Sequence, residues 1–189
     1  MHRISLQPSS YNRTGGLLWI STYVGVHDPA LQRWRLAHPQ LVGGAGDYDL
    51  VCAHPLGYAS GRANGYVYGD VPDGDIDLAE LAERVARLQR FVTMVRESVL
   101  PWFAEASDPD SIVGSRTGDC TSNPVALLEW LAFHGRRDLV HRYAERYRAR
   151  HPGTEQRWAD GVAAAHAGHP CPHGGDTIAQ VAWSAATLS

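Results

Sequence analysis

The residues with the clearest capacity for chemistry lie together near the C-terminus. His166, His169, Cys171 and His173 fall within eight residues and are followed by Asp176. Imidazole nitrogen and thiolate sulfur are ligands that Zn²⁺ prefers, and three of these groups with a water would form a catalytic site. The run therefore makes a zinc-dependent hydrolytic enzyme one candidate function.

A simpler interpretation of the same run needs no metal. Zinc motifs usually combine two close ligands with a second pair far away in the sequence, whereas these four are all local. Prolines on both sides of Cys171 stiffen the loop and direct neighbouring side chains apart. An exposed loop that ends in a helix cap at Asp176 explains the pattern. We therefore expect no cofactor and keep zinc as the alternative.

Arginines form a second group with functional potential. All 17 basic residues are arginines, and seven of them lie within residues 136–157, against three acidic residues there. Guanidinium groups make paired hydrogen bonds to carboxylates and phosphates. Arg137, Arg142 and Arg146 are therefore candidates for binding an acidic protein or, as a further alternative, a nucleic acid. The formal net charge of -3 counts against the nucleic acid.

Three tyrosines in a glycine-rich stretch form another candidate binding surface. Tyr58, Tyr66 and Tyr68 lie between residues 57 and 69. Tyrosine and arginine are the side chains that most often anchor protein interfaces. We interpret this surface, the arginine-rich helix and an open sheet edge as places where a protein partner could bind.

Several catalytic classes are excluded by composition and motif. With no lysine in the chain, a P-loop nucleotide site, a protein kinase and a pyridoxal-phosphate enzyme cannot be built. The chain also has no G-x-S-x-G, H-E-x-x-H or C-x-x-C motif. These absences favour binding over catalysis.

The elements that must position these groups fall into a strand-rich part, residues 1–75, and a helical part, residues 76–189. Alternating or β-branched runs predict strands at 2–7 and 17–26, and shorter ones near 48–53 and 65–69. We expect these four strands to form one antiparallel sheet. The fold class predicted is therefore α+β, in a single domain.

The clearest helical signal is an apolar stripe with steps of three and four residues. Its members are Leu78, Leu81, Val85, Leu88, Val92, Val95, Val99 and Trp102. Asp77 with Glu80 predicts a capping box at the start, and Pro101 predicts a kink or an end. We expect the stripe to face the core across the sheet. An intermolecular coiled coil is the alternative, disfavoured by the small number of regular flanking charge pairs.

The remaining helices are predicted from caps. Asn123 and Pro124 begin a helix that runs to His134, Gly135 ends it, and a second helix over 137–150 completes an antiparallel hairpin. Asp28 caps an earlier helix, and two short helices follow Thr154 and Asp176. No run of 18 apolar residues exists and the start has no apolar leader, so we expect a cytoplasmic protein outside the membrane.

Two stretches carry a resemblance to a known family. VRESVLPWFAEASDPDSI and ALLEWLAFHGRRDLVHRYAERYRARHP resemble a widespread bacterial family of unknown function that pairs a small sheet with a helical hairpin. The segment ISLQPSSYNRTGGLLWISTYVGV is similar to two central strands of that sheet, so the resemblance spans roughly residues 2–150. Genes of this family often lie near toxin and immunity loci, which implies an accessory or immunity-type role.

The family usually has an amphipathic helix and a first strand before the segment at residue 4. Either the native start lies upstream of Met1, or a partner chain covers the sheet edge that this leaves open. Together with the missing catalytic motifs, the resemblance leads us to expect a non-enzymatic protein that binds and occludes a protein partner.

Overall fold

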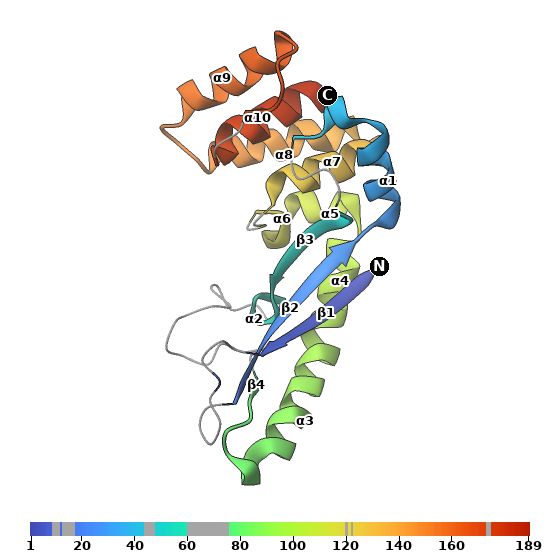
Figure 1. The fold of residues 1–189 in the computed structure, drawn as a ribbon, viewed down its shortest axis with the longest axis vertical. Helices are drawn as coiled ribbons and strands as arrows, with labels where there is room; N and C mark the ends of the chain where they lie inside the picture. Colours follow the sequence, from blue (N-terminus) through green and yellow to red (C-terminus); the bar gives the residue numbers. More distant parts are fainter. Residues whose placement is uncertain are drawn as a thin grey trace. The chain divides into compact units, whose positions relative to one another are not determined.

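The computed structural model describes residues 1–8, 12, 18–43, 48–59, 76–119, 121, 123–172 and 175–189. These residues form a four-stranded antiparallel sheet and a set of helices (Figure 1), which confirms the predicted α+β class. Their contacts divide the chain into two compact units. One unit contains Met1, 27–52 and 108–189, and the other contains 2–26 and 53–107. Each unit therefore combines segments from both the strand-rich and the helical part of the sequence.

The sheet is organised around β2. β1 (His2–Pro8) pairs antiparallel with β2 (Trp19–His27), and the short β4 (Ile76–Asp77) also pairs with β2. β3 (Leu50–Pro55) lies next to β2 on the side away from β1, so β1 is an edge strand. The strands predicted at 2–7, 17–26 and 48–53 are confirmed with small shifts of their ends. The strand predicted at 65–69 lies outside the described residues.

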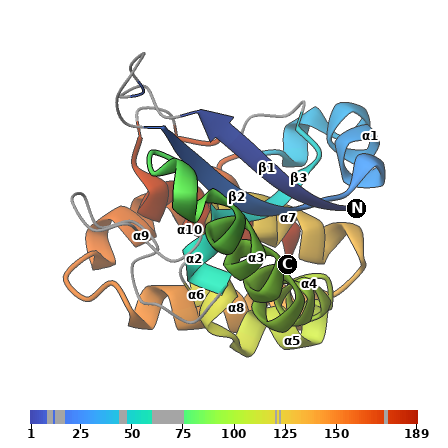
Figure 2. The ribbon, with the colours of Figure 1, turned by 90° about the horizontal axis from the view of Figure 1, so that it is seen from below.

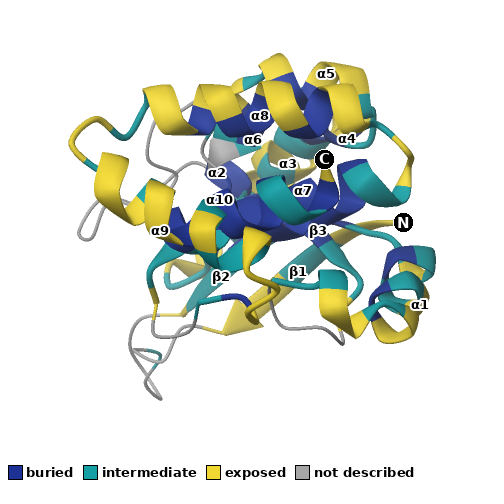
Figure 3. Ribbon diagram, turned by 90° about the horizontal axis from the view of Figure 1, so that it is seen from above, coloured by how far each residue is buried: buried dark blue, intermediate teal, exposed yellow. Residues whose placement is uncertain are grey.

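The unit that contains the C-terminus is mainly helical. Its helices are α1 (Pro29–Ala37), η1 (Pro39–Leu41), α5 (Pro109–Gly114), α6 (Arg116–Asp119), α7 (Pro124–Phe133), α8 (Arg137–Ala149), α9 (Glu155–His166) and α10 (Thr177–Leu188). Every residue of α7 from Pro124 to Leu131 is buried, and α10 packs against α7, α8 and α9. α8 has one buried and one exposed face (Figure 3).

The predicted helical hairpin is confirmed in detail. The Asn123 side chain accepts a hydrogen bond from the Ala126 amide at the start of α7. At its end Gly135 has φ +70°, the left-handed conformation that glycine adopts without strain. The amides of Gly135 and Arg136 donate to the carbonyls of Ala132 and Leu131, so the turn into α8 is closed by a Schellman motif.

A buried ion pair connects four segments of this unit. Arg35 of α1 and Glu129 of α7 are only 3% and 1% exposed, and Arg35 Nε donates to Glu129 Oε2 at 2.6 Å. The other carboxylate oxygen accepts the Gly43 amide at 2.9 Å. The Arg35 guanidinium also donates to the carbonyls of Tyr48 and Leu50. Two loops and two helices thus share one hydrogen-bonded centre.

Removal of one partner of this pair should be strongly destabilising. Arg35→Met leaves the Glu129 carboxylate buried without its cation, and we expect a loss of about 3–5 kcal/mol in the free energy of unfolding. Arg35→Met/Glu129→Leu should recover part of that loss, because no unpaired charge remains. Urea unfolding followed by circular dichroism measures both. A double variant no more stable than Arg35→Met would show that packing, rather than the unpaired charge, causes the loss.

The other unit carries the long helical segment that follows the sheet. It contains α2 (Leu56–Ala59), η2 (Leu81–Glu83), α3 (Arg84–Met94), the π-helical turn η3 (Val95–Val99) and α4 (Leu100–Ala106). In Figure 2, β1 and β2 lie side by side, and the continuous segment α3–η3–α4 runs along one side of the pair. Within η3 the Leu100 amide donates to the carbonyl of Val95, five residues earlier. The helical segment continues through Pro101 to Ala106, so of the two predicted alternatives, a kink or an end at this proline, the end near Phe103 is not formed.

Candidate functional site

The structure exposes half of the apolar stripe that the sequence predicts to be buried. Four of its members keep 43–74% of their surface accessible, and we call them the α3 seam: Leu81, Val85, Leu88 and Val92. No residue of α3 is buried, whereas Val99 and Trp102, further along the stripe, are 0% and 7% exposed. The prediction of a core-facing helix is therefore wrong for residues 81–92 and confirmed for Val99 and Trp102.

The reason for the difference is a change of helical register within η3. A stripe with steps of three and four residues stays on one face only while each turn has 3.6 residues. A π-helical turn closes hydrogen bonds over five residues and so adds one residue to the turn. That extra residue rotates everything after it by about 100° relative to α3. The stripe is continuous in sequence but divided between two faces in space.

The C-terminal end of this segment is anchored by aromatic contacts. Trp102 and Phe103 of α4 are buried. The His2 ring of β1 stacks on the Phe103 ring, with 4.5 Å between the ring centroids and an interplanar angle of 9°. His2 Nε2 also lies 2.6 Å from Ser107 Oγ in a hydrogen bond. The His54 ring of β3 meets Trp102 edge to face. α4 is thereby held against the strands of its own unit.

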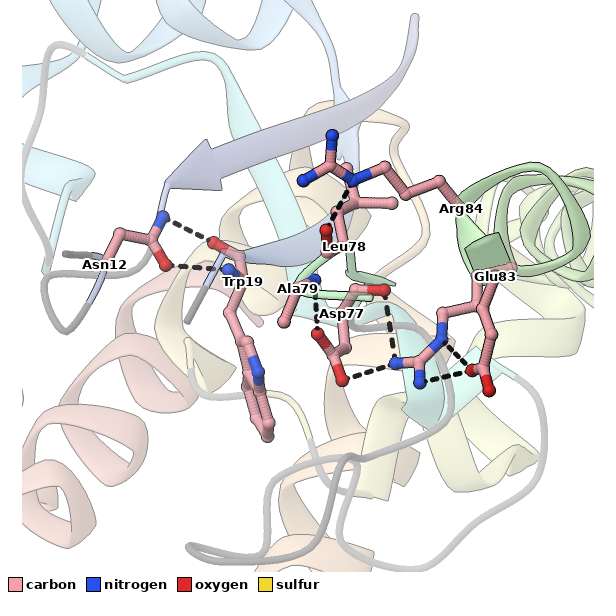
Figure 4. A network of polar contacts seen from close by, with 8 residues as sticks. Asn12, Trp19, Asp77, Leu78, Ala79, Glu83 and Arg84 are labelled. Atoms are coloured by element: carbon pink, nitrogen blue, oxygen red, sulfur yellow. Dashed lines mark hydrogen bonds and ion pairs between the residues drawn. The ribbon is translucent and has the colours of Figure 1, made fainter. Parts of the chain in front are cut away.

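The N-terminal end is anchored by a polar network (Figure 4). Arg87 of α3 donates to the carboxylates of Asp77 and Glu83, and Arg84 Nε donates to the Leu78 carbonyl at 2.6 Å. The hydrogen bonds that Arg87 donates to Glu83 and Asp77 raise the pKa of Arg87. The Asp77 side chain accepts the Ala79 amide and α3 begins only at Arg84. The capping box predicted for Asp77 and Glu80 is therefore not formed.

The seam has the composition of a two-stranded coiled coil. In a heptad written a to g, Val85 and Val92 occupy a positions and Leu81 and Leu88 occupy d positions. β-branched residues at a with leucine at d favour pairs of helices. No acidic residue occurs at the flanking e and g positions of α3 and η3, which are Arg84, Gln89, Phe91, Arg96 and Ser98.

The predicted arginine surface lies on α8, and one of its three arginines is neutralised by an ion pair. Arg137, Arg142 and Arg146 are all exposed. Arg146 donates two hydrogen bonds to the Asp119 carboxylate, from Nε at 2.6 Å and from Nη2 at 2.5 Å. Asp119 also pairs with Arg150. Arg137 and Arg142 form no ion pair with the described residues.

Acidic residues from distant segments of the chain neutralise other arginines on and near α8. Arg136 binds Asp110 through two hydrogen bonds of 2.6 Å. These bonds, and to a smaller degree the charges of Arg136 and Arg142, hold the pKa of Asp110 below its usual value. Arg157 lies 3.7 Å from Asp176. With Asp110, Asp119 and Asp176 included, the excess of positive charge around α8 falls from four to one, so the local count in the sequence overstated the attraction for anions.

The His/Cys run is not gathered into a site within the described residues. His166, at the end of α9, and His169 are exposed, whereas Cys171 is buried. In the part of the chain that the structure describes, no three His, Cys, Asp or Glu side chains lie close enough to hold a metal ion. His173 falls outside that part. Asp176 caps α10 by accepting the Ala179 amide, as predicted.

The surroundings of Cys171 suit a structural thiol. A Cβ built on Gly43 would lie 3.1 Å from Cys171 Sγ and 2.4 Å from Ser184 Oγ, so the three residues are in close contact. Burial, with a smaller effect of the Glu129 charge, raises the pKa of the Cys171 thiol to about 11. At neutral pH the sulfur is therefore protonated, a weak metal ligand and a poor nucleophile.

The remaining predicted surface falls largely outside the described residues. Tyr66 and Tyr68 lie there, and so does the side chain of Tyr58, whose backbone forms part of α2. Cys120 also lies outside. None of the described helices has the length and apolarity needed to cross a bilayer.

No protein-family model matches this chain, and comparison with curated proteins and with solved structures finds no significant match to either. The resemblance to a bacterial family near immunity loci therefore stays a prediction.

The raised pKa of Cys171 predicts a specific dependence of stability on pH. The contribution of the Cys171 thiol to the free energy of unfolding should be constant below about pH 9, the pKa of the thiol in the unfolded chain. It should decrease as the pH rises toward 11, because the thiol of the unfolded chain ionises first. The whole effect should reach at most about 3 kcal/mol. Urea unfolding of the natural chain and of Cys171→Ala between pH 7 and 11 isolates this contribution. Parallel stability curves for the two proteins would contradict it.

Proposed function

We propose that this protein functions by binding another protein chain, and that the α3 seam is the docking surface. The observation that carries the proposal is the exposure of four consecutive stripe members, 74% at Leu81 in the turn η2 and 43–67% at Val85, Leu88 and Val92 in α3, on a segment held at both ends. Apolar side chains exposed singly are ordinary on a surface, whereas a contiguous apolar face marks an interaction site.

The energetics of burial support this choice. Complete burial of a leucine or valine side chain contributes about 1.5–3 kcal/mol, so covering the partly exposed seam contributes several kcal/mol. Association itself costs about 4–15 kcal/mol, and the helix is already formed and anchored before binding. The balance fits at most a weak, reversible complex.

The shape and flanks of the seam define the kind of partner. A straight apolar row on a helix is complementary to the apolar row of a second amphipathic helix. Arg84 and Arg96 flank the row, and none of the flanking e and g positions of α3 and η3 is acidic. A partner helix with neutral or acidic residues beside its own apolar row is therefore compatible with this surface. In an accessory or immunity role such a complex would act by covering part of the partner's surface.

A model helix tests the docking surface directly. We expect a fluorescent synthetic helix with valine at a, leucine at d and acidic flanks to bind the full chain. Leu88→Asp should weaken this binding at least tenfold, because a carboxylate would be buried in the apolar row. Fluorescence polarisation gives both dissociation constants.

Leu36→Asp is the matched control, since Leu36 lies on α1 and is 63% exposed. It should leave binding of the helix unchanged. Equal binding by Leu88→Asp, or no binding by the natural chain, would refute the α3 seam as a docking surface.

A further inference from the structure

We infer that the natural occupant of the α3 seam is a second copy of this chain, paired in parallel as a short two-stranded coiled coil. The inference rests on the proposed function and names the partner. It makes the protein a reversible homodimer whose interface lies on α3 and the preceding turn η2 of one unit.

The order of residues in the seam favours self-pairing. In a parallel pair with matched register, each residue meets its own counterpart, so Val85 and Val92 form valine layers and Leu81 and Leu88 form leucine layers. Parallel dimers prefer β-branched layers at a and leucine layers at d. Within α3 the seam alternates these layers in the correct order at Val85, Leu88 and Val92, and Leu81 precedes them in the turn η2.

The flanking charges permit the same arrangement. In a parallel dimer each g position faces the following e position of the other helix. Arg84 would face Gln89 of the second copy, and Phe91 would face Arg96, which allows a cation–π contact. No arginine faces an arginine at these positions.

The charge of the whole segment also argues for a second copy over a strongly charged foreign partner. Residues 77–97 contain four acidic residues and four arginines, so the segment has no net charge. Two copies therefore approach without net repulsion between these segments. A helix adapted to a strongly acidic partner would instead carry an excess of arginine.

The length of the seam sets the strength of the dimer. Leu81 to Val92 covers about 17 Å of helix, far less than an isolated coiled coil needs for stability. α3 is already folded and anchored through Arg84, Arg87 and α4, so pairing does not have to order the helix. A weak dimer that dissociates on dilution is the expected result.

Sedimentation of the full, untagged chain from low to several hundred micromolar tests the inference. We expect a reversible monomer–dimer equilibrium for the natural chain, a monomer for Leu88→Asp, and an unchanged equilibrium for Leu36→Asp. Circular dichroism should show equal helical content in all three, because both substituted positions are exposed. A natural chain that stays monomeric throughout, or a dimer that persists in Leu88→Asp, would overturn the inference.

A disulfide trap adds a readout of the parallel register. Leu88→Cys should oxidise to a covalent dimer, because the two thiols of a d layer face each other, whereas Leu36→Cys should not. Failure of Leu88→Cys to cross-link in a protein that sediments as a dimer would contradict the parallel pairing.

The two levels of the proposal fail in different ways. A monomeric natural chain that still binds the model helix, with loss of binding in Leu88→Asp, overturns the second copy as occupant and supports the docking surface. A monomeric chain that does not bind the helix overturns both.

Discussion

The missing backbone N–H of Pro101 governs how this protein presents its longest apolar stripe. A proline inside a helix cannot donate to the carbonyl four residues earlier, and its ring crowds that carbonyl. The chain accommodates this in the π-helical turn Val95–Val99, where the Leu100 amide reaches Val95. The one-residue change of register directs Val99 and Trp102 into the interior and leaves Leu81–Val92 at the surface. Without that turn, a stripe of this regularity would lie on one face throughout.

Local chemistry explains which parts of the fold could be predicted from the sequence. The caps at Asp28, Asn123 and Asp176 and the left-handed Gly135 depend on residues within one turn of each other. The apolar stripe with steps of three and four residues predicts an apolar helix face, but periodicity alone does not specify what covers such a face. The core-facing assignment failed because the π-helical turn interrupts the 3.6-residue period.

Long-range contacts explain what could not be predicted. Arg35 and Glu129 are 94 positions apart and pair in the interior, and nothing near either residue indicates it. Asp110 and Asp119 neutralise arginines 26 and 27 positions away, so a local count of charge overstated the basic surface on α8. In the His/Cys run, Cys171 is buried and packs next to Gly43, far from it in sequence.

Our proposal assigns the α3 seam to a second copy of this chain, and alkylation kinetics test this directly. In Val85→Cys the new thiol lies in the middle of the seam, and Leu36→Cys provides an exposed thiol on α1. If a second copy covers the seam, the rate of alkylation of Val85→Cys falls as the protein concentration rises, while that of Leu36→Cys stays constant. A Val85→Cys thiol that reacts at the same rate at every concentration would contradict the account.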